Sequence, residues 1–296
     1  MKIKNTAADR TFIILNYALL SAYFLLVLYP LIYVVSASFS DPTEVNLGHV
    51  FLYPRGFSLE GYHKVFAYQP VWIGYRNTIF YTVVGTAISL CVTLSCAYAL
   101  TRRDMVGRGF IMMIITITMF FGGGLIPTYL VVREMRLINT VWAILLLGAT
   151  SAYNIIVTRT FMSSSIPEEI QEAAMIDGAS DFGIFFRVVL PLSMPIIAVM
   201  TLFFGVGRWN SYFNEMIYLN DSKLYSLQLY LREILVRNQI SEIMSAEDAE
   251  AAADQARVAE IMKYSLIIVS TLPIMCVYPF LQKFFIKGVM LGAVKG

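Results

Sequence analysis

Two histidines, three cysteines and a run of serines are the residues of this chain best suited to covalent chemistry. The serine run 163–165 has no histidine beside it, so a nucleophile activated by a neighbouring base is not indicated. A zinc site needs three or four clustered nitrogen, sulfur or oxygen ligands, and this set supplies no such cluster. The chain is therefore not expected to be an enzyme or to bind a metal. The residues concerned are His49, His63, Ser163, Ser164, Ser165, Cys91, Cys96 and Cys276.

A second kind of chemistry, non-covalent binding of a polar ligand, could be provided by the segment 209–214. It contains Trp209, Asn210, Tyr212 and Asn214, which offer aromatic faces and amide groups. If the segment is helical, Asn210 and Asn214 share one face, because residues four apart are neighbours on a helix. These residues are candidates for a substrate path. The alternative is a belt of aromatic side chains at a membrane surface, where tryptophan and tyrosine are enriched.

The elements that would position these residues are hydrophobic helices. Apolar residues make up 58 % of the 296 positions and charged residues only 14 %, against roughly 45–50 % and 25 % in a soluble domain. Six stretches are long enough to cross a bilayer as helices and contain no Asp, Glu, Lys, Arg or His. We expect spans at about residues 11–39, 77–101, 109–132, 137–158, 188–207 and 264–282.

Basic residues indicate the orientation of these spans. The two faces carry 11 basic residues each, but on 60 residues of chain for the face with the termini and on 96 for the other. The denser face is the cytoplasmic one, so both termini and the loop 159–187 are predicted to be cytoplasmic. The loop 208–263 is then external, and its part 241–263, rich in Ala and Glu, is expected to form a helix. A net charge of +2 gives no indication of nucleic-acid binding.

The cytoplasmic loop 159–187 contains the most distinctive local pattern. Ser165 to Glu168 fits a capping box, which predicts a helix beginning there with Ser165 as its N-cap. Gly178 is expected to end that helix in a sharp turn, and a second short helix should begin near Ser180 and end before Pro191. The first helix is acidic on its polar face, which favours docking onto a protein over lying on lipid.

The same loop resembles a known family. Glu172-Ala173-Ala174, then three residues and Gly178, then nine residues and Val188-Val189-Leu190-Pro191, is similar to the E-A-A-x3-G-x9-I-x-L-P signature of ABC importer permeases, with Val188 in place of Ile. Within that family the chain most resembles the smaller maltose-type sugar permease, as at 125–127, 137–140 and 292–296. Phe121 to Gly124 and Tyr278 to Gln282 resemble a branch importing complex or uronic-acid-containing oligosaccharides through a lipoprotein receptor.

The resemblance implies the MetI-like, type I importer fold, an all-α membrane domain whose spans two to six form the core. It implies a homologous second permease, two ATPase subunits that bind ATP and Mg²⁺, and an extracellular sugar-binding protein or lipoprotein in a bacterial cytoplasmic membrane. By the same resemblance Glu172 contacts the ATPase, through a coupling helix whose other expected residues are Ala173, Ala174, Gly178 and Pro191.

The sequence contains no energy source of its own for transport, which supports this interpretation. No Gly-Lys dipeptide occurs, so the chain has no Walker A loop to hold phosphate. The predicted spans also lack the acidic and histidine residues that proton-driven pumps use. A driven importer of this sequence must take its energy from another subunit. An ion-independent facilitator or a membrane scaffold is the alternative from a different functional class.

Overall fold

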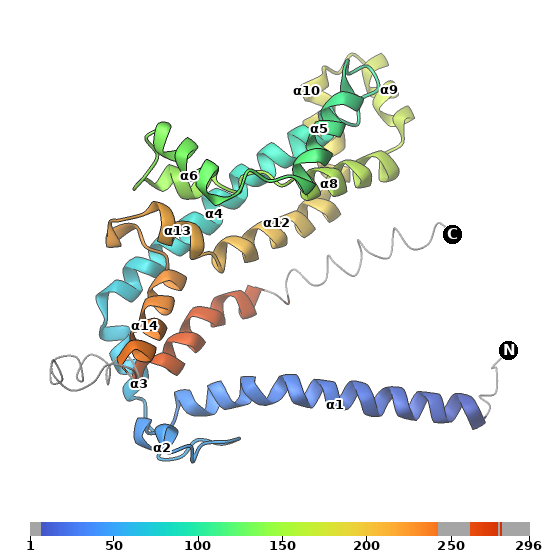
Figure 1. Cartoon of the computed structure of the whole chain (residues 1–296). Helices are drawn as coiled ribbons and strands as arrows, with labels where there is room; N and C mark the ends of the chain where they lie inside the picture. Colours follow the sequence, from blue (N-terminus) through green and yellow to red (C-terminus); the bar gives the residue numbers. More distant parts are fainter. Residues whose placement is uncertain (1–6, 242–260, 278, 280–296) are drawn as a thin grey trace. The chain divides into compact units, whose positions relative to one another are not determined.

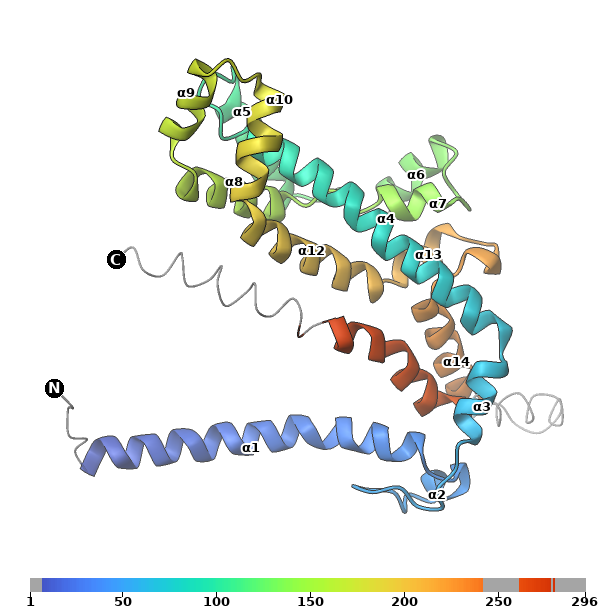
Figure 2. The ribbon, with the colours of Figure 1, turned by 180° about the vertical axis from the view of Figure 1, so that it is seen from behind.

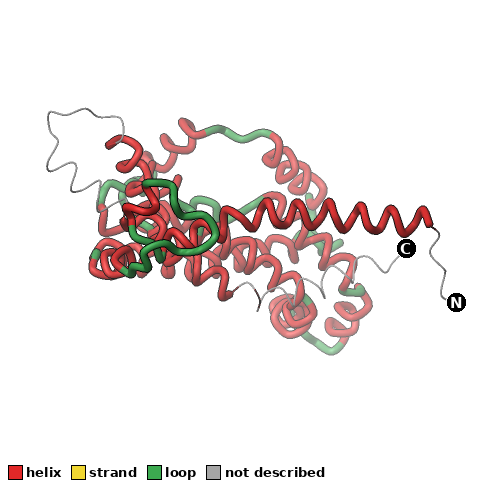
Figure 3. The backbone as a smooth tube through the Cα atoms, turned by 90° about the horizontal axis from the view of Figure 1, so that it is seen from below, coloured by secondary structure: helices red, strands yellow, loops and turns green. Residues whose placement is uncertain are grey.

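The computed structural model describes residues 7–241, 261–277 and 279. All regular structure in these ranges is helical, and Figure 3 shows only helices and loops there. The chain divides into two compact units, Met1–Gln69 with Glu233–Thr271, and Pro70–Arg232 with Leu272–Gly296. Most of the predicted external helix 241–263 lies outside the described residues, as does the tail motif 292–296.

The first unit consists mainly of α1 (Ala7–Ser38), α2 (Pro42–Asn46), α3 (Glu60–Ala67), residues 233–241 of α14 (Leu227–Ser241) and residues 261–271 of the helix Ile261–Val277. Tyr33 and Tyr264 meet edge to face, with ring centroids 5.8 Å apart, and the Ser265 hydroxyl donates to the Ser38 carbonyl at 3.3 Å. Gly61 makes this packing possible, since a Cβ there would collide with Ser265.

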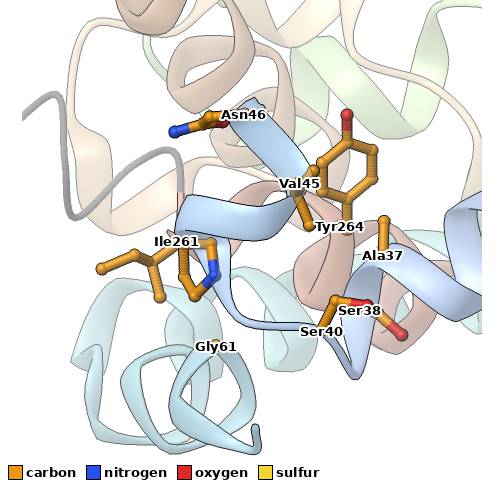
Figure 4. A pocket seen from close by; sticks show the side chains of 9 residues that line it. Ala37, Ser38, Ser40, Val45, Asn46, Gly61, Ile261 and Tyr264 are labelled. Carbon is orange, nitrogen blue, oxygen red and sulfur yellow. The ribbon is translucent and has the colours of Figure 1, made fainter. Parts of the chain in front are cut away.

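A small pocket opens where α1, α2, α3 and the helix Ile261–Val277 converge, and Figure 4 shows the side chains that line it. Its lining includes Ser38, Ser40, Asn46 and Tyr264, and none of its nine lining residues is charged. The pocket therefore lacks the charged groups expected of a catalytic or ion-binding centre.

The second unit is built around two helices, α4 (Gln69–Ala99) and α12 (Met194–Trp209). In Figures 1 and 2, α5 (Arg108–Phe120), α8 (Ala152–Ser165) and the short helices α9 and α10 gather at one end of α4. The opposite end is accompanied by α6 (Leu125–Glu134), α7 (Val141–Leu146), α13 (Phe213–Tyr218) and the first part of α14, residues 227–232.

Each end of the second unit has its own apolar cluster. At the first end Leu94, Ala97 and Tyr98 of α4 pack on Met162, Ile184 and Val189. At the second end Tyr81 of α4 packs on Ile144, Leu145 and Leu219. The two ends are thus fixed separately, each by residues from several helices.

The predicted spans correspond to helices, but not all of them are continuous. Among the described residues, α1 and α4 are each long and apolar enough to cross a membrane. Two bent pairs of helices raise the number to four: α5 with α6, bent by 117°, and Asp181–Leu192 with α12, bent by 80°. The predicted fourth span is interrupted between α7 and α8. The described part of the predicted sixth span lies in the apolar helix Ile261–Val277, and the rest of that span, with most of the motif 278–282, lies outside the described residues. The count of six spans stays a prediction.

Candidate functional site

The first candidate site is the hairpin of α9 (Glu168–Ile176) and α10 (Asp181–Ile184) in the predicted cytoplasmic loop. Gly178 has φ of 82°, in the left-handed region. The Ala179 N–H donates to the Ala174 carbonyl at 2.9 Å, and the Gly178 N–H to the Met175 carbonyl at 2.9 Å. This pair of bonds is a Schellman motif, which satisfies the last carbonyls of α9. Gly178 therefore ends the helix as the sequence predicts.

The start of α9 differs from the sequence prediction. Ser165 is the last residue of α8 and not an N-cap, and α9 begins at Glu168 with Pro167 before it and no side-chain cap. Ile166 is extended, as the residue before a proline tends to be, and it is buried in the cluster with Met162. The capping-box prediction is wrong because burial of Ile166 fixes the chain there.

The second short helix begins at the predicted place and continues past its predicted end. Ser180 is its N-cap and accepts a hydrogen bond from the Gly183 N–H at 3.2 Å. Helical structure then continues through a π-helical turn, Phe185–Val189, and α11 (Leu190–Leu192), so Pro191 lies inside it. Pro191 has no N–H to donate to the helix. It directly follows the π-helical turn, and a helix accommodates a proline at such an irregular turn.

The predicted coupling residues of α9 lie on opposite faces of the helix. Ala174 packs against the apolar cluster at this end of α4. Glu172 is exposed, and Ile176, one turn further on, is 87 % exposed. Because residues four apart share a helix face, Glu172 and Ile176 form an outward surface opposite Ala174. Ala173 is exposed beside them.

Two arginines hold this hairpin to the linker that follows α4. Arg103 Nε lies 2.7 Å from Glu168 Oε1, at the first residue of α9. Arg102 Nη2 lies 3.3 Å from Asp181 Oδ1, at the first residue of α10, and 2.9 Å from Asp104 Oδ2. The hydrogen bond from Arg102 lowers the pKa of Asp104, which keeps that carboxylate charged. Each helix of the hairpin is therefore tied to the same linker.

Sequence reasoning did not find the apolar part of this surface or its arginine ties. Phe182 is 78 % exposed and Phe186 60 % exposed, in the segment that follows Gly178 in the same loop. Exposed apolar side chains in a polar loop indicate a contact with a partner. Reading the loop for apolar residues that interrupt its polar face would have shown them. The pairing of Arg102 and Arg103 with acidic residues some 65–80 positions later needs the tertiary structure.

The second candidate site is the segment 209–214 at the far end of α12. Trp209 is the last residue of α12 and is buried, with its ring 6.3 Å from that of Tyr75 in T-shaped contact. The helix then ends, and α13 begins at Phe213, so Asn210 and Asn214 do not share a helix face as expected. The Asn210 side chain donates to the Val206 carbonyl at 3.0 Å and caps α12.

Tyr212, like Asn210, is exposed among the predicted path residues. It is 40 % exposed, and the guanidinium carbon of Arg232 lies over its ring, 5.8 Å from the centroid. Asn214 is half-buried in the first turn of α13. An exposed aromatic ring beside a cation provides stacking for a sugar and attraction for a carboxylate.

The loop beneath this site is fastened to α4 by polar side chains. Asn77 Nδ2 donates to the carbonyls of Lys223 and Tyr225 at 2.8 and 2.9 Å, and Tyr81 donates to the Leu224 carbonyl at 2.8 Å. Asn139, in a left-handed conformation with φ of 58°, accepts from the N–H groups of Asn220 and Asp221 at 2.9 Å each. These bonds fix the start of α14 and therefore the position of Arg232.

Glu215 and Arg208 are functional candidates that the sequence analysis did not single out. Glu215 is 1 % exposed and accepts a hydrogen bond from Ser211 at 3.0 Å. Burial raises the pKa of the Glu215 carboxyl. Its own backbone amide, the Ser211 hydroxyl and the charge of Arg208 lower this pKa, but by less than burial raises it. Arg208 reaches the interruption between α7 and α8 and hydrogen-bonds there.

The comparisons with known proteins agree with this architecture. Residues 70–291 match the family model described as binding-protein-dependent transport system inner membrane component. The polygalacturonan/rhamnogalacturonan transport system permease protein YtcP of Bacillus subtilis is 40 % identical over 97 % of this chain and 99 % of its own length. Protein LplC of the same organism is 37 % identical over 99 % and 97 %.

A solved structure supports the same assignment. It belongs to a bacterial ABC transporter involved in the import of the acidic polysaccharide alginate. Its matching chain is 36 % identical, with a TM-score of 0.86 over 96 % of this chain and 100 % of that one. The resemblance found in the sequence is confirmed, and the fold is the MetI-like importer fold. The chain belongs to the binding-protein-dependent transport system inner membrane components, and it is a permease subunit of an ABC importer and not an enzyme.

Proposed function

We propose that this chain carries an acidic oligosaccharide across the membrane, receiving it from an extracellular sugar-binding protein or lipoprotein. The observation that supports this best is near full-length identity of 40 % to a permease for polygalacturonan and rhamnogalacturonan. The structural relative imports alginate, which is also acidic. The Arg232 guanidinium over Tyr212 suits the same chemistry, since guanidinium groups bind carboxylates well.

The proposal includes the partners and the membrane arrangement. A homologous second permease completes the membrane domain, and two ATPase subunits bind ATP and Mg²⁺ on the cytoplasmic side. The chain crosses the membrane six times, with both termini in the cytoplasm. Glu172, Ala173, Ala174, Gly178 and Pro191 belong to the coupling loop that docks on the ATPase. Trp209, Asn210, Tyr212 and Asn214 belong to the outer path, where Tyr212 contacts sugar and Trp209 and Asn210 shape the helix end.

Reconstitution of the complex in vesicles tests this function. We expect uptake of galacturonate oligosaccharides that requires both ATP inside and the binding protein outside. Uptake without ATP would indicate a facilitator instead, and no uptake with all partners present would indicate a scaffold. In the same vesicles a cysteine at Ser180, with the native cysteines replaced, should react only with a thiol reagent that reaches the cytoplasmic face. Labelling from outside would reverse the proposed orientation.

Arg232 provides a test of the acidic substrate class. We expect Arg232→Gln to lower uptake of galacturonate oligosaccharides about fivefold, because it removes a partly exposed charge contact worth about 1 kcal/mol. Uptake of the methyl-esterified oligosaccharide, which has no carboxylate, should change little. Lys223→Gln is the matched control, since Lys223 is an exposed cation of the same loop. Equal losses of uptake for the two substrates, or equal losses of uptake in the two variants, would contradict a role for Arg232 in binding the carboxylate.

A further inference from the structure

The interruption of the predicted fourth span leaves carbonyl groups that need donors. Helix α7 ends at Leu146, and α8 begins at Ala152, with Gly148 between them at φ of 73°. The Ala143 carbonyl accepts from the Leu147 N–H at 3.2 Å, and the Leu146 carbonyl from the Ala149 N–H at 3.0 Å. The carbonyls of Ile144 and Leu145 are the two that the local backbone leaves without a donor.

Arg208, from near the end of α12, donates to both of these carbonyls. Its Nη1 donates to the Ile144 carbonyl at 3.2 Å, and its Nη2 to the Leu145 carbonyl at 3.1 Å. Nη2 also donates to the Ser89 hydroxyl of α4 at 3.1 Å. One guanidinium thus joins three elements, and it completes the hydrogen bonding of the interrupted span.

The backbone of α4 is shaped around this guanidinium. A Cβ on Gly85 would lie 2.5 Å from Cζ and Nη1 of Arg208 and 2.6 Å from its Nε. Real Cβ atoms essentially never approach other atoms so closely, so any side chain at this point of α4 would force the Arg208 guanidinium to move. The site is therefore formed from Gly85, Ser89 and the end of α7 together.

The carbonyl end of a broken membrane helix is a cation site, and transporters driven by ion gradients use such ends to bind Na⁺. Here a cation that is covalently part of the chain occupies that end. We propose that Arg208 is a built-in cation that fixes α12 to the broken fourth span, and that it positions the outer path for transport. The transport part rests on the proposed function, because α12 leads from the coupling loop to the segment 209–214.

Binding of free guanidinium tests the site without measuring transport. We expect purified Arg208→Ala to be stabilised by guanidinium, with a rise in thermal midpoint that equal urea or NaCl does not give, because ligand binding to the folded state stabilises it. The wild-type chain should show no such rise. No difference between guanidinium and urea in the Arg208→Ala chain would overturn the proposed cation site.

Transport tests the positioning role. In the assembled complex we expect Arg208→Ala to lower uptake about ten- to hundredfold, as the loss of hydrogen bonds from a charged donor would, and guanidinium to restore part of it. Gly85→Ala keeps the arginine but displaces it, so uptake should fall without rescue. Gly207→Ala is the matched control, since its Cβ would meet no atom within 4 Å.

Uptake by the variants decides the positioning role. Normal uptake by Arg208→Ala, or normal uptake by Gly85→Ala, would overturn it. If Arg208→Ala does not assemble, the uptake of Gly85→Ala per assembled complex decides. If neither variant assembles, the uptake of Arg208→Lys per assembled complex decides. Absence of uptake by the wild-type complex would instead contradict the proposed function and leave the guanidinium-binding result to stand by itself.

Discussion

Replacing Glu172 with alanine is expected to lower ATP-dependent uptake about ten- to hundredfold while the subunit still inserts and assembles. Glu172 is exposed on the face of α9 opposite Ala174, and it has no ion-pair partner among the described residues. Glu168, on the same helix, is already paired with Arg103. Glu169 and Glu172 are the exposed carboxylates of α9 outside this pair, and the matched motif assigns the contact with the ATPase to Glu172. A hydrogen bond to a charged group is worth about 1.5–3 kcal/mol.

Glu169→Ala is the matched control for this prediction. It removes the same charge from an exposed position of the same helix, so it separates a specific contact from a general loss of negative charge. Uptake and ATP hydrolysis should be measured together in vesicles. We expect Glu172→Ala to hydrolyse ATP without matching uptake and Glu169→Ala to behave nearly as the wild type. Equal behaviour of the two variants would rule out a specific role for Glu172.

A series of substitutions at Gly178 should give the second large effect. Its φ of 82° lies in the left-handed region, which costs an ordinary residue roughly 1–2 kcal/mol and a β-branched residue more. We expect uptake to fall in the order Gly, Asn, Ala, Val, because asparagine tolerates this conformation best among non-glycine residues. Valine should remove most uptake, since α10 can no longer turn back against α9 through the Schellman motif.

Gly183→Ala serves as the control for this series. Gly183 lies within α10, and an added Cβ would make only ordinary contact, 3.4 Å from the Ser180 hydroxyl. It changes glycine to alanine in the same loop without demanding a left-handed backbone. Circular dichroism of the purified variants should show unchanged helix content. If Gly178→Val transported as well as Gly183→Ala, the turn geometry would have no part in coupling.

The structure of the loop 159–187 was largely predictable because its signals are local. A left-handed glycine and a serine N-cap depend on residues a few positions apart, and both occur where the sequence places them, at Gly178 and Ser180. The start of α9 was not predictable in the same way. There the burial of Ile166 against Met162 overrides a local capping pattern.

The outer site was predicted less well, because it depends on where helices end. The pattern of Asn210 and Asn214 assumes a continuous helix, whereas α12 ends at Trp209. A new helix, α13, begins at Phe213, and the Ser211 to Glu215 hydrogen bond and the anchoring of the following loop on Asn77 hold it there. Contacts between residues about 150 positions apart cannot be read from local spacing.

The sequence by itself determined that the chain is a helical membrane protein and a permease of the ABC importer type. Hydropathy identifies a helical membrane protein because a bilayer demands long uncharged helices. The motif around Glu172 identifies a permease because its residue spacing is specific. The tertiary structure alone decided that the predicted fourth span is interrupted between α7 and α8 and that Arg208 donates to the carbonyls there. The physical reason is that a break in a helix leaves carbonyl groups without N–H donors, and only the folded chain brings a distant guanidinium to them.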